Sequence, residues 1–178
     1  PSAGERVLAL VRFGGHAEAV VVPADHAFPM PDSMTFEEGA ALPVNYVTAF
    51  HMLFEVGHLR RGQSVLVHMA AGGVGVAVLQ LARTVPDVVV FGTASASKHE
   101  VLRQEGCPHP IDYRTRDYAE EVRRLTGGRG VHLVLDPLGG ADWRKGYALL
   151  RPAGLLVTYG FANMAPGERR SWARILAQ

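Results

Sequence analysis

A glycine-rich run in the middle of the chain, residues 70–75, has the composition of a phosphate-binding turn. It follows a valine-rich apolar run and precedes an amphipathic stretch, so it predicts a turn from a strand into a helix. Glycines there let the backbone approach a pyrophosphate, whose charge is held by free N–H groups at the helix start. A tight turn without a ligand is the alternative, but similar units occur downstream and favour nucleotide binding. The residues predicted to hold the pyrophosphate are Ala71, Gly72, Gly73, Val74 and Gly75.

The end of the second predicted strand indicates which dinucleotide would bind. A protein that binds NAD usually places Asp or Glu about 20 residues beyond the glycines, where it accepts a hydrogen bond from the ribose 2′-OH. Residues 92–98 contain no acid here, and they include Ser95, Ser97 and Lys98. An acid would repel a 2′-phosphate, whereas hydroxyls and an ammonium accommodate one. We therefore predict NADPH; the alternative for Ser97 and Lys98 is helix capping and a solvated first turn.

These residues need a framework that brings the ends of several strands together. From about residue 62 onward, valine-rich apolar runs alternate with helix-patterned stretches. This alternation predicts an α/β fold with a Rossmann-type doubly wound parallel sheet. The predicted strands are residues 64–68, 88–92, 110–112, 131–136 and 155–160.

Polar residues and glycines mark the predicted helix ends. The first helix comes directly after the glycine run. Two more helices begin at capping boxes, in which side chains satisfy the free N–H groups of the first turn, and end at glycines. The capping pairs are Ser97 with Glu100 and Asp117 with Glu120, and the terminal glycines are Gly106 and Gly127.

The chain before residue 62 has a different pattern, typical of the edge of another domain. Residues 17–23 predict a β-segment, and several prolines divide residues 24–43 into short pieces. Thr35 and Glu38 form a further capping box that opens a short helix, which is predicted to stop near Pro43. A second helix is predicted over residues 44–56, ended by a glycine.

Composition limits the classes of function. The chain has 178 residues, of which 48% are hydrophobic and 20% charged, with a net charge of +1. That balance is ordinary for a globular protein and gives no support to nucleic-acid binding. The single cysteine, Cys107, excludes an internal disulfide and a cysteine metal cluster, and it is predicted to be a buried thiol rather than a nucleophile. With neither a membrane-spanning apolar run nor a signal peptide, we expect a cytoplasmic protein, at most peripheral on membranes.

Several segments together resemble a known family. The chain resembles the zinc-independent quinone oxidoreductases related to zeta-crystallin, within the medium-chain dehydrogenase/reductases, over nearly its whole length. Residues 91–100 and 109–113 are most similar to the synaptic vesicle membrane protein homologue branch of that family. The segments that carry the family resemblance are residues 41–50, 70–75, 92–98, 111–113 and 136–140.

The resemblance implies roles for particular side chains. Lys98 and Tyr113 would flank the 2′-phosphate of the adenosine, and Asn45 and Thr48 would line the nicotinamide end. Plain helix capping and packing is the alternative for Asn45 and Thr48, and a core aromatic at a strand end is the alternative for Tyr113. Two glycines at strand ends would form the floor of the cofactor crevice, and one tyrosine is a proton-donor candidate by position only. These last residues are Gly139, Gly160 and Tyr46.

The resemblance also implies a reaction: transfer of a hydride from NADPH to a quinone or an activated alkene, without zinc. Zinc is not expected because no four-cysteine lobe follows Val7, no cysteine lies near Val44, and the histidines lack metal-ligand spacing. The alternative is a non-catalytic NADPH-binding protein, peripheral to vesicle or organelle membranes. The expected partners are a quinone or enone substrate and, for the full-length protein, a second copy in a homodimer.

The family's domain pair predicts how this chain is organised. Residues 1–43 would be the tail end of an N-terminal barrel-like (GroES-like) substrate domain with a connecting helix, and residues 44–178 an NADPH-binding Rossmann domain, incomplete at its C-terminal end. The chain is therefore expected to be truncated at both ends. Residues 169–178 are predicted to begin a helix. We expect the chain to keep nucleotide binding but to have little reductase activity, because the barrel would complete the substrate site.

Overall fold

The computed structural model describes residues 1–163, and the chain divides into two compact units, Pro1–Thr48 and Ala49–Gln178. The predicted domain boundary at residue 43 lies inside a helix that continues to residue 50. The helix start predicted for residues 169–178 lies outside the described residues.

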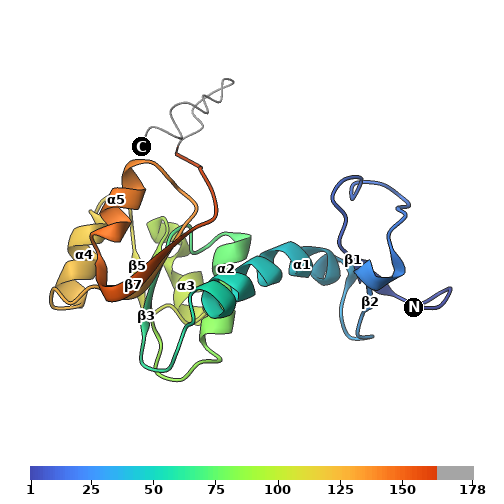
Figure 1. Cartoon of the computed structure of the whole chain (residues 1–178), viewed down its shortest axis with the longest axis horizontal. Helices are drawn as coiled ribbons and strands as arrows, with labels where there is room; N and C mark the ends of the chain where they lie inside the picture. Colours follow the sequence, from blue (N-terminus) through green and yellow to red (C-terminus); the bar gives the residue numbers. More distant parts are fainter. Residues whose placement is uncertain (164–178) are drawn as a thin grey trace. The chain divides into compact units, whose positions relative to one another are not determined.

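The first unit contains a small antiparallel sheet and most of one helix (Figure 1). Strand β1 (Val7–Ala9) pairs with β2 (Ala27–Pro29), and the short 3-10 helix η1 (Ala24–His26) leads into β2. The prediction of a β-segment over residues 17–23 is wrong: these residues form no strand. Val21 is almost fully exposed, and within residues 1–163 no strand pairs with this segment. An extended apolar run that packs against no neighbouring strand is not stabilised.

Helix α1 (Phe36–Phe50) corrects the prediction of two helices separated at Pro43. Its start is as predicted, because Thr35 N–H donates to the Glu38 carboxylate and Glu38 N–H donates to the Thr35 hydroxyl. Pro43 lies inside the helix and is buried. A proline inside a helix removes one backbone hydrogen bond and crowds the carbonyl group four residues earlier, and burial of Pro43 offsets part of that cost. The chain continues as a π-helix, η2 (His51–Val56), up to Gly57.

The second unit is built on a five-stranded, all-parallel sheet in the order β5-β4-β3-β6-β7. The Rossmann-type prediction is confirmed, because the strand order reverses between β3 and β6. Strand β7 begins five residues earlier than predicted: Leu150 pairs with Val131 before a register shift that precedes the pair Leu133 and Leu155. The strands are β3 (Ser64–Val67), β4 (Val89–Thr93), β5 (His109–Ile111), β6 (Val131–Asp136) and β7 (Leu150–Thr158).

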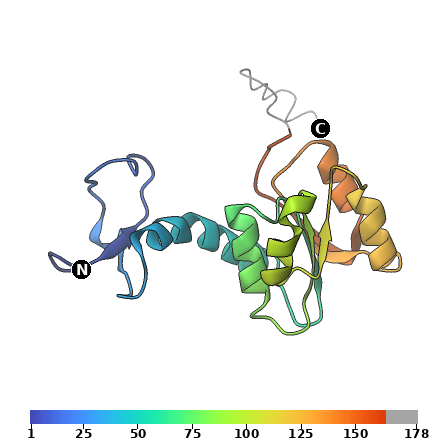
Figure 2. The same ribbon diagram turned by 180° about the vertical axis from the view of Figure 1, so that it is seen from behind.

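Helices cover both faces of this sheet. Figures 1 and 2 show α2 and α3 on one face and α4 and α5 on the other. On the α4 side, Leu66, Phe91 and Ile111 of three neighbouring strands form one buried cluster with Tyr118 and Val122 of α4. Each fully buried aliphatic side chain contributes about 1.5–3 kcal/mol. The helices are α2 (Gly73–Ala82), α3 (His99–Gln104), α4 (Tyr118–Leu125) and α5 (Ala141–Tyr147).

The predicted helix ends hold in part. The predicted terminal glycines come after α3 and α4, with φ of +93° at Gly106 and +59° at Gly127. The Ser97–Glu100 capping box is wrong, because Ser97 lies in a short 3-10 helix, η3 (Ala96–Lys98), and its hydroxyl is 3.3 Å from that of Ser95. Helix α3 begins two residues later, so Glu100 already lies in its first turn and pairs with Arg103. Helix α5 was not predicted.

Asp117 caps α4 as predicted, and its removal should destabilise the second unit. Its carboxylate accepts hydrogen bonds from the N–H groups of Ala119 and Glu120 and lies 2.7 Å from the Lys145 ammonium. We expect Asp117→Ala to lower the free energy of unfolding by about 1 kcal/mol. Asp117→Asn keeps the cap and loses the Lys145 pairing, so it should cost less. Urea unfolding of both variants tests the order, and equal losses would contradict the capping role.

Candidate functional site

The glycine run forms the turn from β3 into α2, at the point where the strand order reverses. Met69 adopts the left-handed conformation, with φ of +51°, and its carbonyl accepts a hydrogen bond from Gly72 N–H at 2.8 Å. A Cβ on Gly75 would lie 2.5 Å from the carbonyl oxygens of Met69 and Ala70, so only glycine fits there. Gly72 precedes α2 without a side-chain cap. The first N–H groups of α2 therefore resemble those that hold anions at helix starts.

A cleft of about 420 Å³ opens beside this turn, at the carboxyl ends of the strands. It brings together five of the residues predicted to bind the cofactor: Ala71, Gly72, Ser95, Lys98 and Tyr113. Ligands of doubly wound sheets bind in this position, outside the strand ends. Residues that the sequence motifs did not single out complete the lining: Met69, Thr93, Ala94, Arg114, Leu138, Ala162 and Asn163.

The lining of the cleft includes two cations. Lys98 comes after β4, and Arg114 comes after β5 directly beyond Tyr113, so two positive side chains line the same cleft. The Arg114 guanidinium lies 5.9 Å from the centre of the Tyr113 ring, which is half exposed. Asp112 holds the turn, because its carboxylate accepts a hydrogen bond from Arg114 N–H at 3.1 Å. Arg114 was missed, although a second cation next to a predicted phosphate ligand was a signal that could have found it.

The remaining predicted glycines lie at the ends of β6 and β7. Gly139 has φ of +78°, and its N–H donates to the Asp136 carboxylate at 3.0 Å. A Cβ on Gly160 would lie 2.7 Å from the Pro137 carbonyl oxygen, so glycine allows these two strand ends to approach closely. Neither lines the cleft, and neither do Ser97 or the helical residues Gly73, Val74 and Gly75.

The residues predicted for the nicotinamide end lie on α1. The Asn45 side-chain amide donates to the Ala41 carbonyl oxygen at 2.9 Å, one turn earlier in the helix, and Thr48 is half buried. These contacts fit the packing alternative, so the nicotinamide role stays a prediction. Tyr46, the proton-donor candidate, lines a separate cleft of about 450 Å³ in the first unit, together with Met34 and Leu42.

A buried polar cluster supports the cofactor cleft from beneath. His68 is fully buried, and its Nδ1 lies 3.2 Å from the hydroxyl of Thr93, which also accepts a hydrogen bond from Met69 N–H. Asp136 is equally buried and accepts N–H bonds from Leu138 and Gly139. Among the described residues, His68 Nε2 and Asp136 Oδ2 have no hydrogen-bond partner. Burial lowers the pKa of His68, although the carboxylate of Asp136 opposes the shift.

The lowered pKa of His68 predicts loss of stability in mild acid. Below pH about 6.5 the imidazole binds a proton in the unfolded state but not in the folded state. The free energy of unfolding therefore decreases as the pH is lowered, until the pH reaches the lower pKa that His68 has in the folded state. The slope from one such proton is at most about 1.4 kcal/mol per pH unit. We expect His68→Gln to flatten the pH dependence measured by urea unfolding from pH 8 to 5. An unchanged slope would show that His68 is protonated alike in both states.

A doubly wound sheet with a glycine turn at its reversal point and a cationic cleft beside it defines a dinucleotide-binding domain. The chain belongs to the zinc-binding dehydrogenase family of medium-chain dehydrogenases/reductases, whose sequence profile matches residues 73–178. The family and the fold are those of oxidoreductases that use a nicotinamide cofactor.

The relatives lie in the branch that the sequence indicated. The chain is 62% identical to the synaptic vesicle membrane protein VAT-1 homolog of Danio rerio, over 94% of this chain and 34% of the relative. The crystal structure of the human VAT-1 homolog-like protein has a TM-score of 0.76 at 47% identity, covering 88% of this chain and 46% of that one. The chain thus spans less than half the length of either protein.

Solved reductases share the same fold. The CurK enoyl reductase has a TM-score of 0.75 at 36% identity, over 82% of this chain and 43% of its own. A quinone oxidoreductase of Pseudomonas syringae has a TM-score of 0.73 at 31% identity, over 79% and 43%. The fold of this chain is therefore similar to that of an enoyl reductase and to that of a quinone oxidoreductase.

The family's description raises the question of a metal. Within residues 1–163, no group of three or more His, Cys, Asp or Glu side chains could hold one, so these residues do not fit a zinc site. Cys107 is buried, its thiol donates to the Val90 carbonyl oxygen, and burial raises its pKa to about 11. In the same part of the chain, no helix has the length and apolar character to cross a membrane.

Proposed function

We propose that this protein is an NADPH-dependent oxidoreductase that transfers hydride to quinones or activated alkenes without zinc. The observation that carries the proposal is the cleft in which Lys98, Tyr113 and Arg114 lie beside the glycine turn. The cations complement a 2′-phosphate, and within residues 1–163 no acid lines the cleft to accept a hydrogen bond from a free 2′-OH. The likeness to a quinone oxidoreductase and an enoyl reductase supports the choice of acceptors.

Each part of the chain has a proposed task. The glycine turn and the start of α2 bind the pyrophosphate, and Lys98 with Arg114 neutralises the 2′-phosphate. The nicotinamide of bound NADPH supplies the hydride, so the protein has to align the acceptor and exclude water. On the family resemblance, Asn45 and Thr48 would orient the nicotinamide, and Tyr46 is the candidate proton donor by position.

The proposal is tested by measuring NADPH oxidation by the full-length protein with a panel of quinones and α,β-unsaturated ketones. We expect turnover that saturates in both substrates and that is much weaker with NADH. Turnover with unactivated ketones alone would contradict the proposed acceptors, because an unassisted carbonyl needs polarisation that this site does not supply.

We further propose that the reaction needs no zinc. The described residues contain no cluster of metal ligands, and the only cysteine is buried with a raised pKa. We expect elemental analysis of the purified protein to give far less than one zinc per chain, and a chelator to leave NADPH oxidation unchanged. Stoichiometric zinc, with activity lost on chelation and restored by the metal, would contradict the proposal.

A second candidate is a non-catalytic NADPH-binding protein, peripheral to membranes. The similarity to a protein named for the synaptic vesicle membrane favours it. The same assays separate the two candidates, because NADPH binding without turnover of any acceptor supports the second. A cytoplasmic location and a homodimer of the whole protein are proposed for both.

A further inference from the structure

A second cleft, of about 450 Å³, lies along the β5 edge of the sheet, and the residues lining it are all different from those lining the cofactor cleft. We infer that this cleft binds the phosphate group of a small soluble ligand. Its basic and acidic walls come from α3, β5, α4 and the segment between β5 and α4. The residues that carry the argument are His99, Arg103, His109, Arg116, Glu121 and Arg124.

The charge of the lining favours an anion. Three arginines face two carboxylates, Asp112 and Glu121, so the lining itself has a net charge of +1 before the histidines are counted, while Arg103 also pairs at 3.5 Å with Glu100 just outside the lining. Asp112 is already engaged by its own turn, because it accepts hydrogen bonds from Arg114 N–H at 3.1 Å and from the Thr115 hydroxyl at 3.3 Å. Glu121 is therefore the one lining carboxylate that contacts the cleft arginines within the described residues.

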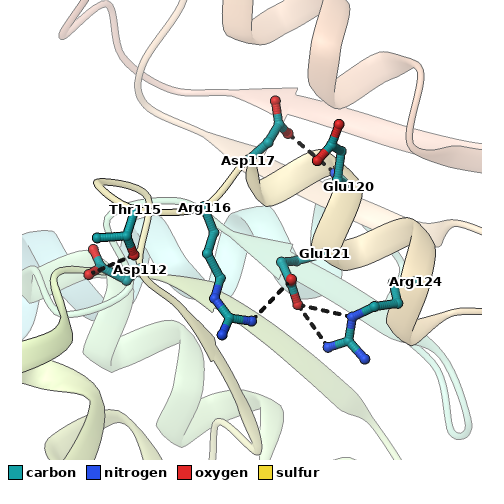
Figure 3. A network of polar contacts seen from close by, with 7 residues as sticks. All are labelled: Asp112, Thr115, Arg116, Asp117, Glu120, Glu121 and Arg124. Atoms are coloured by element: carbon teal, nitrogen blue, oxygen red, sulfur yellow. Dashed lines mark hydrogen bonds and ion pairs between the residues drawn. The ribbon is translucent and has the colours of Figure 1, made fainter.

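Glu121 holds two guanidinium groups in place (Figure 3). One carboxylate oxygen lies 3.1 Å from Arg116 Nη1, and the other accepts from Arg124 Nε at 3.3 Å and Nη2 at 2.8 Å. A guanidinium has five N–H donors, so both arginines keep further donors for a ligand. The Glu121 carboxylate thus occupies donors that a phosphate would use, and it competes with such a ligand.

The ion pairs of Glu121 contribute little to stability. The Arg116 and Arg124 side chains are 61% and 64% exposed, and exposed ion pairs contribute only about 0–1 kcal/mol. Planar guanidinium groups are the side chains that bind phosphate through paired hydrogen bonds. The His109 ring is fixed as well, because it stacks on Phe91 with centroids 5.0 Å apart. The volume falls in the range of about 300–1,000 Å³ typical of small-molecule sites.

The test is a calorimetric titration of the full chain with inorganic pyrophosphate in the presence of saturating NADPH, which fills the cofactor cleft. We expect pyrophosphate to bind still, and Arg116→Gln and Arg124→Gln each to raise its dissociation constant about tenfold. Arg123→Gln, on the same helix but outside the cleft lining, is the matched control and should bind as the unsubstituted protein does. Glu121→Gln should bind more tightly, because it removes the competing carboxylate, and a purely structural network would not show this gain.

Two outcomes overturn the inference. The first is pyrophosphate binding that NADPH abolishes and that neither arginine substitution weakens, because the anion then sits in the cofactor cleft. The second is arginine-dependent binding to vesicles that contain phosphatidylserine without any binding of free pyrophosphate, because the ligand is then a membrane surface. The inference is independent of the proposed function: if NADPH does not bind, a Lys98→Gln variant removes the cofactor-cleft contribution instead, and the same comparison of Arg116, Arg124 and Arg123 variants applies.

Discussion

Gly75→Ala is expected to weaken cofactor binding strongly and to destabilise the second unit. The added Cβ would lie 2.5 Å from the carbonyl oxygens of Met69 and Ala70 and 2.6 Å from the carbonyl carbon of Ala70. These are backbone atoms, so no side-chain rotation relieves the contact, and the turn from β3 into α2 has to move. We expect a loss of about 1–3 kcal/mol in the free energy of unfolding. The dissociation constant of NADPH, measured by fluorescence titration, should rise at least about a hundredfold.

Gly72→Ala is the matched control in the same turn. A Cβ there would lie 3.2 Å from the Met69 carbonyl oxygen, a contact that a shift of a few tenths of an ångström relieves. We therefore expect a much smaller loss in the free energy of unfolding. If the two variants were equally stable, the close approach of the Met69 and Ala70 carbonyl oxygens would not be what requires glycine at position 75.

Lys98→Ala is expected to remove most of the preference for NADPH over NADH. Lys98 lines the cleft with Arg114, and a charge-assisted hydrogen bond to a phosphate contributes about 1.5–3 kcal/mol. The NADPH dissociation constant should therefore rise about ten- to a hundredfold, while that of NADH, which has no 2′-phosphate, stays the same. Titrating both cofactors against the variant and the unsubstituted protein measures the two effects separately.

Lys98→Arg keeps the positive charge and should retain most of the preference, which distinguishes a phosphate contact from loss of local structure. A Lys98→Ala variant that binds NADPH as tightly as the unsubstituted protein would remove Lys98 from the 2′-phosphate site. A fall in affinity for both cofactors alike would assign Lys98 to another part of the nucleotide.

The strands were predictable because their period and composition are local properties. Short apolar runs, most of them rich in valine, identified every strand of the large sheet, and glycines in the left-handed conformation ended α3 and α4 where expected. The failures needed tertiary information. Pro43 continues a helix because the surrounding packing favours it, and the first part of β7 is hidden in the sequence by Pro152 and by Ala153, which has φ of +62°. Neither is visible in a pattern of neighbouring residues.

The candidate site was predictable where a motif carried it. Ala71 and Gly72 of the glycine turn line one cleft with Lys98 and Tyr113. The spacing or the resemblance indicated each of them. Arg114 could have been predicted, because it directly follows Tyr113 in the sequence. Leu138 and Asn163 also line the cleft, and the Asn163 N–H donates a hydrogen bond to the Leu138 carbonyl oxygen. That bond joins the segments beyond β6 and β7, so it exists only once the sheet has formed.

Because Cys107 is buried, its reaction with a thiol reagent would measure how often the surrounding structure opens. The thiol is shielded beneath β4, and its pKa of about 11 keeps it protonated near neutral pH, so a thiol reagent cannot attack it in the closed state. Because the sequence contains no other cysteine, every labelling event would report an opening around α3 and β5. The labelling rate, compared with that of the unfolded chain, gives the free energy of that opening without denaturant. Binding of a ligand in either cleft of this region would slow the rate in proportion to its occupancy.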